Sequence, residues 1–283
     1  MIAPYVTAAE FTAHPTYLDL DDLRTGISDP AAQSAELTNL LLMASAWADG
    51  ECNQPLAAHQ VTATTRGRID RTGVLRVHAF NHPVLDVTSF AYGPDPFHMA
   101  TGPVPQWAPE GESNNIAFHV GRAFRPGQWV TVQWSYVAGW VSTVLDDNTA
   151  AGTTSLSVAD PTGIRPGGTY RLWEPGTEEF ITVSPAYTPP PVTAPPAAAV
   201  VPLATPALHN HTPGAGWSGM EGDIRLAVML YTVSQLLRPD TSKEDSYPDT
   251  SLSSGTRQRD PRQDGSGLVA EARRLLNRFH RVR

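Results

Sequence analysis

The chain has 283 residues, of which 41% are hydrophobic, and this is enough apolar material to build cores for two compact units. Its formal net charge of -8 argues against a protein whose whole surface binds nucleic acid, although it leaves room for a local basic patch. The one cysteine, Cys52, can form no internal disulfide, so we expect a small buried side chain at a helix end and no bridge-stapled scaffold.

Two helices are predicted near the start of the chain. The sequence from Thr7 to Glu10 has the T-x-x-E form of a capping box and predicts a short helix that ends at His14-Pro15. Asp29-Pro30 is an N-cap followed by proline, and it predicts a helix to about Glu51. The apolar stripe of this second helix includes Leu40 and Trp47, which we assign to the core.

The first 51 residues are strongly acidic, with eight acids and one base, Arg24. We interpret the run Asp19, Asp21 and Asp22 as solvated, because no ordered spacing of metal ligands follows it. Residues 1–10 contain no basic region followed by an apolar run, so we expect no signal peptide, and no segment of the sequence qualifies as a membrane span.

Residues 61–140 change from a helical to a strand-like period. Val130, Val132, Trp134 and Tyr136 alternate with polar residues, and the same alternation occurs around residues 75–79 and 116–120. These segments predict half-buried antiparallel strands.

Residues 142–216 form a separate β unit by pattern, with short strands at 155–158, 170–173 and 180–183 and an extended proline- and alanine-rich loop over 188–206.

No catalytic or metal motif is found in the sequence. His209-Asn210-His211 could place two histidines on one face of a strand, but no Cys, Asp or Glu ligand follows at a workable spacing. The sequence also lacks a phosphate-binding loop, a nucleophile elbow, a C-x-x-C and an H-E-x-x-H motif. We therefore expect no enzyme, no metal and no cofactor.

The segment from Gly222 to Pro239 predicts a helix that is apolar on two faces, with Asp223 as its N-cap and Pro239 as its stop. One face holds Ile224, Ala227, Val228 and Tyr231, and the other holds Leu226, Leu230, Val233 and Leu237. Such a helix must be surrounded, so we assign Val228, Leu230 and Tyr231 to the core and expect packing against the helix at 30–51. Leu230→Asp should then prevent folding or assembly, since a buried unpaired carboxylate costs several kcal/mol.

The closing helix, predicted over 267–282, has an apolar stripe and a cluster of arginines toward its C-terminal end, where the helix dipole favours cations. A solvated basic face and a partner-docking face are both consistent with this pattern. We favour docking of a partner protein, because the cluster lacks the interleaved aromatics of a single-strand nucleic-acid site. The residues assigned to docking are Arg274, Leu276, Arg278, Phe279, Arg281 and Arg283.

The order of these elements resembles the head-tail connector (adaptor) proteins of long-tailed bacteriophages. The resemblance rests on the T-x-x-E start, the helix ending near 47–53, the strand 82–90 (HPVLDVTSF), the strand 132–140 (VQWSYVAGW) and the helix start at 223–228 (DIRLAV), and it covers about 200 residues. In that family the second main helix follows the last strand directly, whereas residues 142–216 intervene here. The inserted segment resembles a small β module recurrent in phage virion proteins, through residues 151–158, Gly167, Glu179, His211 and Gly214 in matching order.

The resemblance implies an α+β fold, a helical connector core with an antiparallel β region and an inserted small all-β domain. The connector domain would be discontinuous, over 1–141 and 217–283, with the insert at 142–216 and its ends, Val141 and Trp217, close together. Family members form a homo-oligomeric ring, usually of twelve copies, in the virion neck. The ring is assembled in the host bacterial cytoplasm, attaches to the portal protein and receives the head-closure or tail protein. DNA passes through its channel without sequence-specific binding, and no membrane is involved.

Two alternatives remain open at this stage. The inserted domain could act as a virion decoration or carbohydrate-binding module, which exposure of Trp173 and Tyr187 together would support. A hydrolase fused to a helical scaffold is the other, and it would need a perturbed carboxylate or histidine pair in a pocket.

Overall fold

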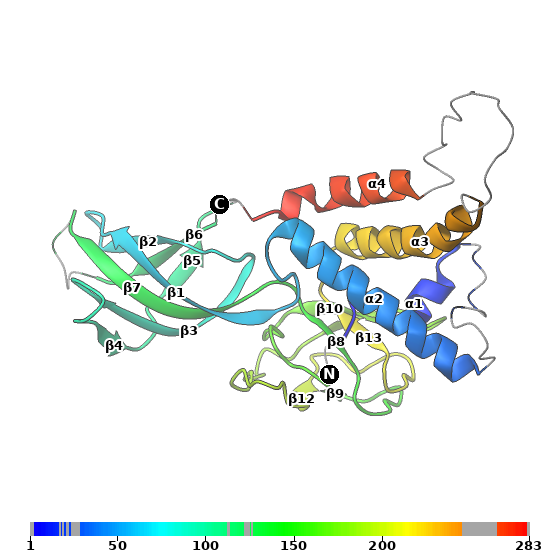
Figure 1. Cartoon of the computed structure of the whole chain (residues 1–283). Coiled ribbons are helices and arrows are strands. Elements are labelled where there is room, and N and C mark those ends of the chain that lie inside the picture. The colour runs from blue at the N-terminus through cyan, green and yellow to red at the C-terminus, as the bar shows by residue number, and fades with distance from the viewer. Residues whose placement is uncertain are drawn as a thin grey trace, which may run out of the picture.

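The computed structural model describes residues 3–16, 18, 20, 23, 29–111, 114–121, 125, 127–244 and 265–281, with only the backbone for 238–244 and 266. The described residues form an α+β fold with three hydrophobic clusters. Figure 1 shows the three parts that hold them: a group of helices, a β lobe that extends to one side of the helices, and a small β module beneath helix α2.

The helical unit joins the two ends of the chain. It contains α1 (Ala8–Ala13), α2 (Pro30–Cys52), α3 (Gly222–Glu244), α4 (Ser266–Leu276) and the short 3-10 helix η1 (Asn277–Phe279). Buried side chains of all five elements belong to one hydrophobic cluster, and the rings of Trp47 on α2 and Tyr231 on α3 stack with centroids 4.0 Å apart. Helix α3 therefore packs against α2, as the sequence predicts.

The first two helices begin where their capping residues predict. The Thr7 hydroxyl accepts a hydrogen bond from the Glu10 N–H at 3.1 Å, and the Asp29 carboxylate accepts one from the Ala31 N–H at 3.1 Å. Asn53 caps the C-terminal end of α2, and its φ of 53° is in the left-handed region that commonly closes a helix. Cys52, in the last position of α2, is fully buried, as expected.

The bounds of α3 differ from the prediction at both ends. The carbonyl of Glu221, one residue before the helix, accepts hydrogen bonds from the Ile224 and Arg225 N–H groups, so Asp223 lies in the first turn and is not the cap. The helix also continues through Pro239 to Glu244. Proline removes one backbone N–H donor, so the helix loses one of its hydrogen bonds but does not have to end there.

The two apolar faces of α3 are covered unequally. Ile224, Ala227 and Val228 are fully buried in the helical cluster. Leu230 and Val233, from the second face, are only partly buried against it, and Leu226 is 36% exposed. Among the other residues assigned to the core, Trp47 and Tyr231 are partly buried against the cluster, and Leu40 is half-buried.

The β lobe consists of two antiparallel sheets. One has the order β1-β7-β3-β4 and the other β2-β6-β5, and their facing side chains share one cluster that includes Phe90, Phe118 and Trp134. The apolar residues that alternate with polar ones in the sequence, such as Val130, Val132, Trp134 and Tyr136, are the buried, inward-facing residues of these strands. The strands are β1 (His59–Arg68), β2 (Val74–His78), β3 (Val84–Gly93), β4 (Ala100–Gly102), β5 (Trp107–Pro109), β6 (Asn115–His119) and β7 (Trp129–Ala138).

The small module has its own core and begins and ends on neighbouring strands. It contains β8 (Ser142–Val144), β9 (Ser155–Val158), β10 (Thr169–Trp173), β11 (Glu179–Thr182), β12 (Ala199–Pro202) and β13 (Gly216–Ser218), in sheets β11-β10-β13-β8 and β12-β9. Strand β13 pairs with β8, and the Gly219 N–H donates to the Val141 carbonyl at 2.8 Å. The two ends of segment 142–216 therefore lie side by side.

Two details of the module differ from the sequence prediction. The proline- and alanine-rich segment contains a strand, β12, because Val200 and Val201 pair with Ser157 and Leu156 of β9. Val141 and Trp217, expected at the junctions, are buried in the core of the module itself. Within the described part of the chain, no helix combines the length and the apolar content that crossing a membrane requires.

Candidate functional site

Helix α4 was the sequence candidate for partner docking, and its apolar side is covered by the chain's own helices. Ala272, Leu276 and Phe279 are 0%, 2% and 4% exposed in the helical cluster. The Phe279 ring also meets the ring of Trp140 edge-on, with centroids 5.3 Å apart. Leu276 and Phe279 therefore stabilise the subunit and offer no surface to a partner. An amphipathic stripe predicts burial, but it does not say which element provides the cover.

The segment that follows α4 is fixed to the end of α2 by hydrogen bonds to backbone carbonyls. The Gln54 side-chain amide donates to the Phe279 carbonyl at 2.8 Å, and the Arg281 N–H donates to the Cys52 carbonyl at 2.9 Å. Burial raises the pKa of the Cys52 thiol to about 12, with Asp49 and Glu51 adding to the effect, so this cysteine is not a nucleophile at neutral pH.

The arginines of α4 and η1 have partners within the subunit. Arg273 lies 2.9 Å from Glu51, and Arg274 lies 2.6 Å from Glu271, one turn earlier on its own helix. Arg278 pairs with Glu221 and Asp223, and Arg281 lies over the ring of Phe80 at 5.3 Å. Arg274 and Arg278 keep 70% and 55% of their side chains exposed. These two remain open to a partner, while Arg283 lies outside the described residues.

A second cluster joins the module to the helices through Glu10. This side chain is 8% exposed, and its Oε1 lies 2.6 Å from Nη1 of Arg171 on β10 and 2.6 Å from Nη1 of Arg225 on α3. Arg171 also pairs with Glu178 at 2.5 Å and lies over the ring of Trp173. One buried carboxylate thus holds three segments that are far apart in the sequence.

This role of Glu10 could not be read from its local sequence, because the T-x-x-E spacing is typical of a capping box. In a capping box the glutamate turns back to the N-cap backbone, whereas here it reaches across to the two arginines. Beside the cluster is a cavity of about 320 Å³ with Arg171, Trp173, Arg225, Leu226 and Met229 in its lining. The cavity lies next to the partly uncovered row of α3 formed by Leu226, Leu230 and Val233.

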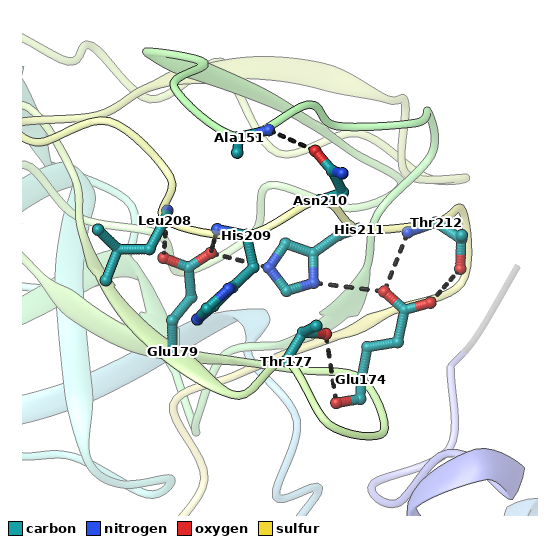
Figure 2. Close-up of polar contacts among 9 residues, drawn as sticks. All are labelled: Ala151, Glu174, Thr177, Glu179, Leu208, His209, Asn210, His211 and Thr212. Carbon is teal, nitrogen blue, oxygen red and sulfur yellow. Dashed lines mark hydrogen bonds and ion pairs between the residues drawn. The ribbon is translucent and has the colours of Figure 1, made fainter.

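The third cluster is centred on His211, whose side chain is fully buried between two glutamates (Figure 2). Its Nε2 lies 2.8 Å from Glu179 Oε1, and its Nδ1 lies 3.3 Å from Glu174 Oε2. Glu179 also accepts hydrogen bonds from the N–H groups of Leu208 and His209. The cluster fixes the 208–212 segment against strand β11.

The pKa values of both glutamates are lowered although the residues are partly or fully covered. Burial alone would raise the pKa of Glu179, but the hydrogen bonds from Leu208, His211 and His209 favour the ionised form and outweigh it. Burial likewise opposes a lowered pKa at Glu174, where the two hydrogen bonds from Thr212 and the nearby His211 prevail. Both carboxylates are therefore held ionised by the fold.

This geometry does not favour the two alternative functions. A general acid or base must reach its substrate, and the His211 side chain has no exposed surface. The carbohydrate hypothesis asked for Trp173 and Tyr187 to be exposed together, but Tyr187 is 7% exposed and Trp173 is half-buried under Arg171. Across the residues that the structure describes, no group of three or more His, Cys, Asp or Glu side chains could hold a metal ion.

The chain was compared with protein-family models, with curated proteins and with solved structures. No protein-family model matches the chain, and no curated protein matches it. The chain is similar to a chain in a solved structure described as the neck of an empty GTA particle computed with C6 symmetry. The identity is 16% and the TM-score 0.33, over 100% of this chain and 97% of the other. A likeness this distant supports no assignment by itself.

Proposed function

We propose that the protein is a structural subunit of a head-tail connector ring in the neck of a phage-like particle. The ring lies between the portal and the head-closure or tail protein, and DNA passes through it. The proposal rests on the order of sequence motifs described above and on one structural observation: the second apolar face of α3 is left partly uncovered.

The uncovered row provides a surface for a neighbouring copy. Leu226 is 36% exposed at the rim of the cavity beside Arg171 and Arg225, and Leu230 and Val233 continue the row along the helix, half-buried. A row that one subunit covers incompletely can be completed by a second subunit packed beside it. Contacts between two different surfaces of identical subunits produce a closed ring when the rotation closes.

Native mass spectrometry of the purified full-length protein, alone and mixed with its portal protein, tests the proposal. We expect a closed oligomer of a single size in at least one of the two samples. Leu226→Asp should abolish it while leaving the far-ultraviolet circular dichroism of the subunit unchanged. The matched control is Phe97→Asp, since Phe97 is 91% exposed on a loop of the β lobe. A wild-type protein that stays monomeric in both samples would overturn the proposal.

Docking of α4 to the portal protein has to be tested with a point substitution and not with a truncation. Truncation after Arg273 would remove Leu276 and Phe279 from the helical core and would unfold the end of the subunit. Arg274→Glu changes an exposed side chain whose partner within the described chain is Glu271. We expect weaker portal association and a loss of stability below about 1 kcal/mol, because the pair with Glu271 is exposed. Arg165→Glu, on the surface of the module, is the control. Equal portal association of the two variants would remove α4 from the docking surface.

A further inference from the structure

The far end of the β lobe contains a groove that no part of the proposed function uses. His59 of β1 and Ala138 of β7 pair near the helices, and the ladder continues for ten residue pairs to Arg68 and Trp129. At about 3.3 Å per residue the groove therefore lies about 30 Å from the helical end of the ladder. It has a volume of about 750 Å³.

Four arginines from two neighbouring strands and the turn between them line the groove, together with Asp70 and Trp129. Arg66 and Arg68 are two positions apart on β1 and so point to the same side, and Trp129 is the cross-strand partner of Arg68. Arg76 and His78 have the same relationship on β2, and Arg71 lies in the turn. We call the set Arg66, Arg68, Arg71, Arg76, His78 and Trp129 the arginine groove.

Gly67 allows the two strands to approach this closely. A Cβ at this position would lie 2.6 Å from Leu75 Cδ1 and 2.7 Å from the Arg76 carbonyl oxygen. Any other residue would push β1 away from β2 and would separate the arginines that the two strands bring together.

Most of the positive charge in the groove is not neutralised. Arg76 is paired, with Asp70 at 2.7 Å and Glu110 at 2.5 Å. The Arg68 guanidinium donates to the Gly127 carbonyl and pairs with no carboxylate among the described residues. The side chains of Arg66 and Arg71 form no hydrogen bond or ion pair with the residues that the structure describes, and both are exposed. In a chain with a net charge of -8, such a concentration of cations creates a local positive field that attracts an anionic partner.

We propose that the arginine groove binds the phosphodiester backbone of DNA. Guanidinium groups match phosphate oxygens in pairs, and the indole of Trp129, 57% exposed, provides a surface on which an unpaired base can stack. An acidic peptide would satisfy the arginines but has no planar base for the indole. The inference does not depend on ring formation or on portal docking.

Fluorescence anisotropy with labelled duplex DNA and labelled single-stranded DNA, from about 50 to about 200 mM salt, tests the inference on the full-length protein. Arg66→Ala/Arg71→Ala should make the slope of log affinity against log salt shallower by about 1.8 for duplex DNA and about 1.4 for single strands. Trp129→Ala should weaken single-strand binding about tenfold and leave duplex binding unchanged if the base stacks on the indole.

A matched pair of single substitutions separates the groove from general surface charge. Arg71→Ala should lower the slope for duplex DNA by about 0.9, and Arg165→Ala, an exposed arginine of the module, should leave it unchanged. Equal effects of the two substitutions would overturn the inference, as would a wild-type protein that binds neither DNA at the lowest salt. Tighter binding of a polyglutamate peptide than of either DNA would assign the groove to a protein partner instead.

Discussion

The arginines of α4 and η1 differ from those of the arginine groove in whether a carboxylate of the same subunit pairs with them. On α4 and η1, Arg273, Arg274 and Arg278 each have a carboxylate of the same subunit as a partner. In the arginine groove, Arg66 and Arg71 have none among the described residues. A cluster of cations in the sequence therefore does not show which cations are available to a ligand. Only the positions of the acids in the fold show this.

We expect removal of an arginine–carboxylate pair to lower the free energy of unfolding, and removal of an unpaired arginine to leave it nearly unchanged. The most deeply buried partner is Glu10, so Glu10→Gln should have the largest effect. Loss of its charge leaves Arg171 and Arg225, 14% and 19% exposed, without the carboxylate between them. We expect the free energy of unfolding, measured with urea, to fall by about 3 kcal/mol. Glu51→Gln, which frees the exposed Arg273, is the control and should cost less than about 1 kcal/mol. Equal costs would show that burial does not distinguish these pairs.

The His211 cluster extends the comparison to partnered carboxylates. Glu179→Gln removes one of the two ionised partners of the buried histidine and should destabilise the module by about 2 kcal/mol. Urea unfolding followed by near-ultraviolet circular dichroism, to which the module's Trp217 contributes as one of seven tryptophans, can follow this loss. A variant as stable as the wild type would mean that the neutral amide replaces the carboxylate at no cost.

The same cluster predicts a dependence on pH. The pKa values of Glu174 and Glu179 are lower in the folded state than in the unfolded chain, so they contribute stability above the ordinary glutamate range. This contribution should be lost as pH falls below about 4. Urea unfolding at a series of pH values should show the loss in the wild type and a smaller loss in Glu179→Gln. Identical pH profiles would contradict the prediction.

Arg278→Ala should have a smaller effect, of about 1 kcal/mol or less. The side chain is 55% exposed, so its pairs with Glu221 and Asp223 are screened by solvent, and part of the loss comes from its contact with the Phe279 ring. Thermal unfolding at low and high salt separates the two parts, because only the ion pairs weaken with salt. A loss that does not change with salt would assign the whole effect to the ring contact.

The smallest effect is expected from Arg66→Ala/Arg71→Ala, which should change the free energy of unfolding by no more than about 0.5 kcal/mol. The two side chains are exposed and make no contact with a carboxylate in the described residues. Urea unfolding of this variant beside Arg278→Ala gives the direct comparison. A loss larger than that of Arg278→Ala would mean that the groove arginines have a structural role.

Much of the fold could be predicted from local patterns. The capping residues Thr7 and Asp29 marked where α1 and α2 begin, and the alternation at 130–136 marked the buried face of β7. These signals act within a few residues, and a sequence displays them directly. The strand β12 was missed because its pairing partner, β9, lies about 40 residues earlier and the prolines around it indicated a loop.

The sites were harder to predict, because they depend on contacts between distant segments. Glu10 meets residues 161 and 215 positions away, and no local spacing reveals such a triad. Leu276 and Phe279 have the pattern of a docking stripe, and the pattern cannot tell a partner from the subunit's own helices. The arginine groove did leave a signal, four arginines between positions 66 and 76, but the glycine that lets the two strands meet has meaning only in the fold.

The balance of charge at the Glu10 cluster bears on how segment 142–218 could be inserted into or removed from this chain. If segment 142–218 were cut out and residues 141 and 219 joined, the helices would keep Glu10 with Arg225 as a neutral pair. The excised piece would keep Arg171 with Glu178 in the same way. Neither product would contain a lone buried charge. On electrostatic grounds, therefore, the Glu10 cluster does not oppose gain or loss of the module as a unit.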